Sequence, residues 1–419
     1  MTGPRAACSL VLLAALAGCG GSKTSPPPPD RASATPSDED MDRLRSLPYA
    51  GFARGSAGEP SGVTVYDPAR SQPGVDLYTI QQLSTAELID ERGRVLRSWH
   101  RDPPFTWERA NLLANGDLVV IGADPPLRPG PGIPDDKRYI ARYDWNGTLL
   151  WKRSLRAHHD VERTPSGRLL TLTFERKRVP AFGSSIDTRD DLLTLLDDDG
   201  RVVDRLSLLD AFSRTPGLDV VPVGPSTLGV VPWLDLFHVN AAEWMHRPEL
   251  AKSNPIYGPD NVLICSRHQN RIAIVSWAHR RVVWSWGPGE LLGPHDAQVL
   301  PSGHVLVFDN GMGRGWSRVV EVDPATDRIV WEYRAKNPRD FYSLSKGSCQ
   351  RLANGDTLIA DSDNGTAFEV TPAGEIVWRF ATPHRGPRGE RLAIVRMRRI
   401  DRSVVDALSS AHGDSGSSR

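Results

Sequence analysis

The 419-residue chain carries 51 Lys and Arg side chains and 51 Asp and Glu side chains, so its formal net charge at pH 7 is zero. This balance, without a long run of like charge, gives no indication of nucleic-acid binding. A chain of this length ordinarily divides into two or three domains, but a β-propeller can take it up in one.

Residues 1–19 have the pattern of a lipoprotein signal peptide. Arg5 precedes the apolar run ACSLVLLAALAG, which is too short to span a bilayer and fits the apolar region of a signal peptide. LAGC at 16–19 resembles the lipobox of bacterial lipoproteins, so we expect lipidation of Cys19 and an exported protein facing the periplasm, outer membrane or cell surface. The alternative is an ordinary secretory signal in which Cys19 is incidental.

Segments poor in large apolar side chains flank one predicted folded domain, which spans 62–405. Residues 20–61 are rich in Pro and Ser and are expected to form a disordered tether, and residues 406–419 a disordered tail. The domain contains Cys265 and Cys349, which lack a metal-binding spacing. We interpret both as small buried side chains, with their pairing left open.

The folded region repeats a turn, a β-branched strand and, in four copies, a tryptophan four residues after the turn, as in DWNGTLLWKR and TPAGEIVWRF. The six turn residues are 54, 53, 80, 47 and 47 positions apart, and they are Gly93, Gly147, Gly200, Arg280, Asp327 and Gly374. This spacing predicts an all-β, six-bladed β-propeller, because a four-stranded unit buries its faces only by stacking on neighbours. The tryptophans are expected to pack between blades, and they are Trp151, Trp284, Trp331 and Trp378.

A second hairpin, with an X-Gly turn, precedes most copies and completes each four-stranded blade, as in HDAQVLPSGHVLVFD. In one copy a 14-residue insertion at 247–260 interrupts this hairpin. The first tryptophan unit has no such partner. We therefore expect GVTVYDP (62–68) and RLAIVRMRRID (391–401) to complete its blade together and to close the ring.

Histidines recur at a fixed distance from these turns. The first strand of each repeat is expected to line the central channel, so an equal offset from the turn means an equal depth around the axis. Counting eight residues back from the turn glycine selects Glu108, His159, His295 and Gly347. The interrupted blade offers His238 at the start of its strand. Three histidines from three blades are therefore predicted to converge.

Alternation of side chains along a strand separates each of two histidines from the aspartate that follows it. Asp160 and Asp296 are therefore expected to point away from the channel and to bond backbone groups between blades. His238 and Asn240 are two residues apart and share a face. Arg267 ends the following strand, within reach of the same channel mouth.

Two chemistries fit this set of residues. Three neutral imidazoles can hold a zinc ion with one position open to water. Alternatively, the histidines with Asn240 and Arg267 form an anion pocket whose donors stabilise a group in transfer. Zinc-binding histidines usually need orienting carboxylates, and alternation points Asp160 and Asp296 away, so the sequence favours the anion pocket without a metal.

The repeats also carry longer segments, among them HHDVERTPSGRLL, HVNAAEW, ICSRHQN, HDAQVLPSGHVLVFDNG and SCQRLANGDTLIADSDNGTAFEVTPAGEIVWRF. In their order and spacing, from about residue 62 to 382, they resemble the bacterial arylsulfate sulfotransferases. The resemblance implies a six-bladed propeller that moves a sulfuryl group from an aryl sulfate donor to a phenolic acceptor. It also implies a ping-pong reaction through a sulfated histidine, without phosphoadenosine phosphosulfate or another cofactor.

The resemblance assigns roles to single residues. His295 in HDAQ matches the family's nucleophile, and we expect His238 and Arg267 to be catalytic beside it. The residues expected to bind substrate are His159, Asn240, Lys346 and Ser348, with the register of the last two left open.

Some features depart from the family. The tether leaves no room for the N-terminal β-rich domain of its long members, so the oligomeric state is open, as is the role of the insertion at 247–260. The alternative to a sulfotransferase is a non-enzymatic, lipid-anchored propeller that serves as a scaffold or binding module. A third possibility is a propeller hydrolase or a quinone-cofactor-like enzyme.

Overall fold

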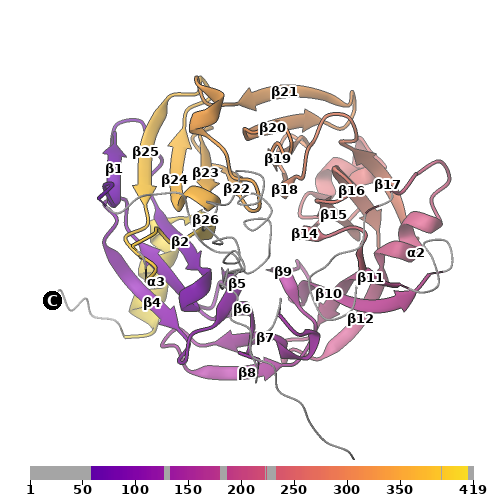
Figure 1. The fold of residues 1–419 in the computed structure, drawn as a ribbon, viewed down its shortest axis with the longest axis horizontal. Helices are drawn as coiled ribbons and strands as arrows, with labels where there is room; N and C mark the ends of the chain where they lie inside the picture. Colours follow the sequence, from indigo (N-terminus) through magenta and orange to yellow (C-terminus); the bar gives the residue numbers. More distant parts are fainter. Residues whose placement is uncertain are drawn as a thin grey trace, which may run out of the picture.

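Six antiparallel sheets surround a central axis in a computed structural model that describes residues 58–126, 133–179, 186–221, 223, 233–387 and 389–413 (Figure 1). The prediction of an all-β, six-bladed propeller is confirmed. The signal peptide, Cys19 and the predicted tether before residue 58 lie outside the described residues.

Each blade runs from an inner strand at the channel to an outer strand at the rim. In order from the channel outward, blade 1 contains β26 (Ile394–Ile400), β2 (Val75–Ile80), β3 (Thr85–Ile89) and β4 (Val95–His100). Blade 2 contains β5 (Thr106–Leu112), β6 (Leu118–Ala123), β7 (Arg138–Tyr143) and β8 (Leu149–Arg153). Blade 3 contains β9 (His158–Arg163), β10 (Leu169–Arg178), β11 (Asp187–Leu196) and β12 (Val202–Ser207), and β13 (Trp233–Asp235) pairs in parallel with β11.

The remaining blades follow the same plan. Blade 4 contains β14 (Val239–Trp244), β15 (Asn261–Ser266), β16 (Arg271–Ser276) and β17 (Arg281–Trp286). Blade 5 contains β18 (His295–Val299), β19 (Val305–Asp309), β20 (Arg318–Asp323) and β21 (Arg328–Tyr333). Blade 6 contains β22 (Ser348–Arg351), β23 (Thr357–Asp361), β24 (Thr366–Val370) and β25 (Ile376–Ala381), with β1 (Gly62–Tyr66) outside β25.

Helices are short in the described part of the chain. The α-helices are α2 (Leu208–Ser213) and α3 (Arg402–Ala411), and the 3-10 turns are η1 (Gln81–Leu83), η2 (Asp135–Lys137), η4 (Pro248–Lys252), η5 (Pro255–Tyr257), η6 (Pro338–Asp340) and η7 (Ser362–Asn364). None of the described helices is both long and apolar enough to cross a lipid bilayer.

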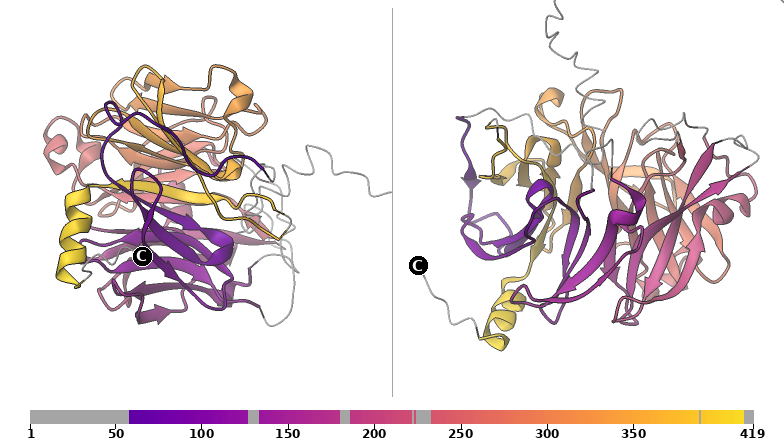
Figure 2. Two further views of the ribbon diagram at one scale, coloured as in Figure 1. Left: turned by 90° about the vertical axis from the view of Figure 1, so that its left-hand side faces the viewer. Right: turned by 60° about the horizontal axis from the view of Figure 1, so that its bottom comes forward.

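The end of the ring differs from the sequence-based prediction in two places. The strand β26 does complete blade 1 by pairing with β2, as expected. The segment 62–68, however, was assigned to the wrong blade, because β1 pairs with β25 and covers the open outer edge of blade 6. The expected disorder of 406–419 is also wrong up to residue 411: α3 continues from β26 and buries Val405 and Leu408 against blades 1 and 2 (Figure 2).

Apolar clusters fill the interfaces between blades. The cluster between blades 1 and 6, for example, contains Tyr78, Trp378 and Phe380, and similar clusters lie in the other gaps around the ring. The predicted inter-blade role of the tryptophans is confirmed, because their indole N–H groups donate to carbonyl or carboxylate oxygens of the next blade. The acceptors of Trp151, Trp284, Trp331 and Trp378 are Asp198 O, Asp327 Oδ1, Pro372 O and Glu91 O.

Carboxylates tie the inner strands to each other. Asp160 accepts the backbone N–H of Ala242 at 3.1 Å, and Asp296 accepts that of Cys349 at 2.8 Å. Both bonds cross from one blade to the next, which confirms the predicted structural role of these aspartates. Glu243 does the same for Val299 at 2.8 Å.

The insertion at 247–260 lies at the end of blade 4 opposite the histidines. It forms η4 and η5, and the Tyr257 hydroxyl donates to Gly303 O at 2.6 Å in the β18–β19 turn of blade 5. The insertion therefore braces two neighbouring blades.

Replacing Trp378 by alanine is expected to destabilise the ring. The side chain is fully buried and its N–H bonds across the blade 6–blade 1 interface, so we expect a loss of about 3–5 kcal/mol in the free energy of unfolding. Equilibrium urea unfolding measures this loss. Trp331→Ala, at a partly exposed position, is the matched control, and an equal loss in both variants would contradict the argument.

Candidate active site

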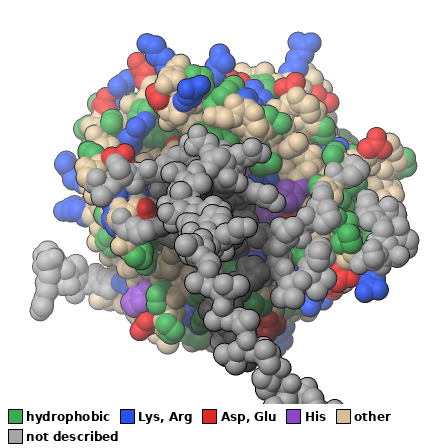
Figure 3. Space-filling model, in the orientation of Figure 1, with side chains coloured by type: hydrophobic (Ala, Val, Ile, Leu, Met, Phe, Trp, Pro, Cys, Tyr) green, Lys and Arg blue, Asp and Glu red, His purple; other side chains and the backbone are tan. Residues whose placement is uncertain are grey.

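A cavity of about 60 Å³ lies among the ends of the inner strands. Histidine side chains are visible near the centre of this face of the molecule (Figure 3). The residues that line the cavity are Gln81, Glu108, Arg109, His159, His238, Asn240, His295, Asp296, Ser345, Lys346, Gly347, Val395 and Arg396. All four residues selected by the eight-residue offset are therefore brought together, and His238 joins them.

The structure brings some of the other predicted site residues to the cavity and leaves others outside it. Asn240 and Lys346 line the cavity, whereas Arg267 is buried beside it. Ser348 is not brought to the cavity: it is fully buried, and its Oγ accepts the backbone N–H of Met397 on β26. From the segment SKGSCQ, the residues Ser345, Lys346 and Gly347 line the cavity.

Bulges at the starts of the inner strands aim these side chains. The pairing register shifts next to His159 on β9, next to Val239 on β14 and after His295 on β18. His159, His238 and Asp296 have left-handed backbone φ angles of 57°, 45° and 54°. A bulge breaks strict alternation, which is why the expectation that Asp296 points away is wrong: His295 and Asp296 both line the cavity.

His295 is a neutral imidazole with a defined tautomer. Its Nδ1 lies 2.7 Å from Asn310 Oδ1 and 3.2 Å from the carbonyl oxygen of Gly293. Both partners are acceptors, so Nδ1 carries the proton and Nε2 keeps its lone pair. Burial, assisted by the charge of Arg267, lowers the pKa of His295 to about 3.

The orientation of Asn310 follows from its own hydrogen bonds. Its Nδ2 donates to Ser343 O at 2.6 Å and to Lys346 O at 2.8 Å. Both acceptors are carbonyl oxygens, so the amide cannot be reversed and Oδ1 must face His295. Asn310 therefore fixes the tautomer of His295.

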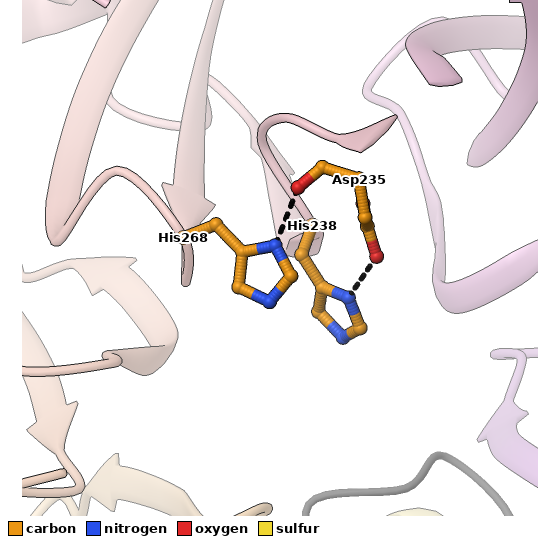
Figure 4. Close-up of side chains that lie close together, drawn as sticks. All are labelled: Asp235, His238 and His268. Carbon is orange, nitrogen blue, oxygen red and sulfur yellow. Dashed lines mark hydrogen bonds and ion pairs between the residues drawn. The ribbon is translucent and has the colours of Figure 1, made fainter. Parts of the chain in front are cut away.

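His238 belongs to a short chain of polar groups (Figure 4). Its Nδ1 donates to Asp235 Oδ2 at 2.6 Å, which leaves Nε2 on the far side of the ring. His268 Nδ1 donates to the backbone oxygen of Asp235 at 2.5 Å. Burial lowers the pKa of His238 well below its ordinary value, against the opposing pull of the Asp235 carboxylate. The His238 ring also lies 4.9 Å from that of His159.

Arg267 is a buried cation with weak partners, and the residue is only 5% exposed. Nη1 lies 3.1 Å from His268 Nε2 and Nη2 lies 3.2 Å from Met312 Sδ, and the buried Nε has no hydrogen-bond partner in the part of the chain that the structure describes. Among the described residues, the hydrogen bonds of this guanidinium thus go to no carboxylate. A buried guanidinium in this state favours an anion next to it.

The metal alternative has less support in this geometry. Asp235, His238 and His268 place potential ligand atoms within 4.8 Å of one another, but only one of these histidines belongs to the predicted set of three. The Nδ1 atoms of His238 and His268 already bond to Asp235, and the guanidinium of Arg267 lies beside Nε2 of His268. Because a divalent cation would face that positive charge, the donor set does not suit a metal.

Comparison with known proteins identifies the family. A family described as Arylsulfotransferase (ASST) matches residues 110–383, which is more than half of the chain. The chain belongs to the arylsulfotransferase family. The predicted family is therefore confirmed, and the match supports arylsulfotransferase activity in general and small-molecule substrates of the aryl sulfate and phenol type.

Other comparisons add no argument to this family assignment. No protein of curated function matches the sequence. A Bacteroides caccae protein of unknown function is 11% identical, with a TM-score of 0.48 over 78% of this chain and 99% of its own. Virginiamycin B lyase from Staphylococcus aureus, crystallised as an inactive variant with quinupristin, is 10% identical, with a TM-score of 0.44 over 80% of this chain and 87% of its own.

Several residues that the sequence did not point to hold the predicted site residues in place. Asp235 lies three positions before His238, and Asn310 directly follows the strand β19 that pairs with the His295 strand. Arg396 comes from β26, far away in sequence, and reaches the cavity between Asp160 and Asp296 at 3.3 Å and 2.8 Å. The short separation of Asp235 from His238 was a usable signal, but nothing local pointed to Arg396.

Replacing Asn310 by aspartate is expected to raise the pKa of His295, because a carboxylate beside Nδ1 stabilises the imidazolium. Histidine-selective NMR titration measures this pKa. Wild-type His295 should stay neutral over roughly pH 5–8, whereas in the variant it should titrate in that range. The control is Asn337→Asp at an exposed position. An unchanged His295 titration in the Asn310 variant would show that Asn310 does not set the charge state.

Proposed function

We propose that this protein moves a sulfuryl group from an aryl sulfate to a phenolic acceptor through a sulfated His295, without phosphoadenosine phosphosulfate. The observation that carries the proposal is an unprotonated His295 Nε2 close to the buried Arg267, whose positive charge lowers the pKa of His295. An aryl sulfate is a monoanion with a tolerable leaving group, so a neutral imidazole can attack its sulfur.

The first half-reaction forms a nitrogen–sulfur bond and breaks the bond between sulfur and the phenolic oxygen. His295 Nε2 supplies the electron pair, and Arg267 with Lys346 stabilises charge on the sulfuryl oxygens. His295 Nδ1–H keeps its bond to Asn310 while the ring is sulfated.

The leaving phenolate takes a proton from His238. The free imidazole is neutral, but an anionic ester bound beside it raises its pKa, and Asp235 supports the imidazolium. In the second half-reaction the phenolic acceptor gives its proton back to His238 Nε2. Its oxygen then attacks sulfur, and the nitrogen–sulfur bond breaks to restore neutral His295.

The cavity admits little more than the transferring group. Its volume of about 60 Å³ is far below the roughly 300–1,000 Å³ of sites that enclose whole ligands. We infer that the sulfuryl group enters the cavity and that the aryl ring stays at its mouth.

Replacing His295 by asparagine should abolish release of 4-nitrophenol from 4-nitrophenyl sulfate, because it removes the nucleophile. Wild-type protein incubated with donor alone should gain the mass of one sulfuryl group on the peptide that contains His295. His279→Asn, at an exposed turn, is the control and should retain full activity.

The acceptor dependence of that assay separates the candidate functions. Release that requires an added phenol supports sulfuryl transfer, and release to water alone indicates a sulfatase. No release by the wild-type protein favours the non-enzymatic scaffold. Normal turnover by the His295→Asn variant would falsify the assignment of the nucleophile.

We also propose that the protein is exported and held on a membrane by a lipid on Cys19. The support is the lipobox-like LAGC at 16–19, behind an apolar run of signal-peptide length. Cys19→Ser should move the protein from the membrane pellet to the soluble fraction after cell fractionation, since a tethered domain without its lipid has no anchor. Equal membrane recovery of both proteins would contradict a lipid anchor.

A further inference from the structure

A methionine lies against the proposed anion-binding arginine. Met312 belongs to the loop between β19 and β20, and its Sδ is 3.2 Å from Arg267 Nη2. The loop is held in place because the N–H groups of Gly311 and Met312 both donate to Leu292 O, at 2.9 Å and 3.2 Å. Arg314 adds an ion pair to Asp309 at 3.0 Å.

Met312 also lies close to Gly293, which contacts the proposed nucleophile His295. A Cβ atom placed on Gly293 would come within 3.4 Å of Met312 Sδ, and Gly293 O is one of the two acceptors that His295 Nδ1 faces. The thioether therefore stands between the backbone next to His295 and the guanidinium of Arg267.

Met312 is more accessible than the other described sulfur atoms. Met245 and Met397 are each 1% exposed, and Cys265 and Cys349 are fully buried, whereas Met312 is partly exposed. An oxidant in solution therefore reaches Met312 before the other sulfur-containing residues that the structure describes.

The sulfur leaves Arg267 available to an incoming anion. A thioether is a weak acceptor, so the Nη2–H group keeps most of its capacity for a sulfuryl oxygen. A sulfoxide oxygen is a strong acceptor in the same place. One result is a hydrogen bond from Nη2 to the sulfoxide oxygen, which competes with the substrate. The other is displacement of the guanidinium, because the added oxygen would lie within the 3.2 Å between Sδ and Nη2.

We propose that Met312 is an oxidation site through which a peroxide lowers sulfuryl transfer by occupying Arg267. Hydrogen peroxide transfers one oxygen atom to Sδ and leaves as water, so the thioether is oxidised to a sulfoxide and the peroxide is reduced. The inference rests on the proposed function of Arg267. The change is reversible, because methionine sulfoxide reductases restore the thioether.

Peroxide treatment followed by a transfer assay tests the inference. The protein is treated with hydrogen peroxide, the oxidised fraction of Met312 is measured by peptide mass spectrometry, and transfer from 4-nitrophenyl sulfate to a phenol is assayed. We expect kcat/KM to fall at least about tenfold as Met312 is oxidised, and to recover with a methionine sulfoxide reductase. A hydrogen bond to a charged group is worth enough to account for a change of this size.

Variants separate Met312 from other oxidation sites. Met312→Gln places a carbonyl oxygen where the sulfoxide oxygen would lie, and it should show the low kcat/KM of the oxidised protein without peroxide. Met312→Leu has no sulfur, so its kcat/KM should not change further on treatment. Met245→Leu, in the core, is the matched control and should remain peroxide-sensitive.

Each outcome decides between the inference and its alternatives. Equal sensitivity of Met312→Leu and the wild-type protein would overturn it, as would full activity of a sample in which Met312 is oxidised. If the untreated wild-type protein transfers no sulfuryl group, the proposed function fails instead, and the mass spectrum still reports whether Met312 is the accessible methionine.

Discussion

Acidic side chains on three inner strands, β9, β14 and β18, hold the next inner strand in place around the ring. The carboxylates of Asp160, Glu243 and Asp296 accept backbone N–H groups across blade boundaries, where strand pairing cannot reach. These bonds fix the relative height of neighbouring blades. The site depends on that height, because its histidines come from three blades and meet only if their strands begin at the same level.

The site is formed largely by ionisable groups removed from water, and their pKa shifts make stability depend on pH in opposite directions. Burial lowers the pKa of His295 from 6.5 to about 3, so the unfolded chain binds the extra proton and this group favours folding more as pH rises through that window. Burial raises the pKa of Asp160 from 3.8 to about 7 even though Arg109 opposes the rise. The folded chain then holds the extra proton, so the contribution of Asp160 falls as pH rises from 3.8 to 7.

The sequence was most informative where the structure is periodic. Turns at blade-like spacing predicted six blades, and the eight-residue offset selected Glu108, His159, His295 and Gly347, which all line the cavity. Sequence reasoning failed where the backbone leaves the regular strand. Alternation misplaced Asp296 because a bulge follows His295, and β1 was misassigned because an outer edge carries no local signal for its partner. Asn310 was missed because its role depends on two carbonyl groups in a distant loop.

The position of β26 near the end of the chain means that the cavity is completed last. It contributes Val395 and Arg396 to the cavity, yet it follows every other inner strand along the chain. A nascent chain therefore lacks one wall of the cavity, even when His295 and Arg267 have already folded into their blades. Until residues 394–400 have docked, blade 1 lacks its inner strand and the cavity is open on that side, so a complete site exists only after the last strand joins the ring.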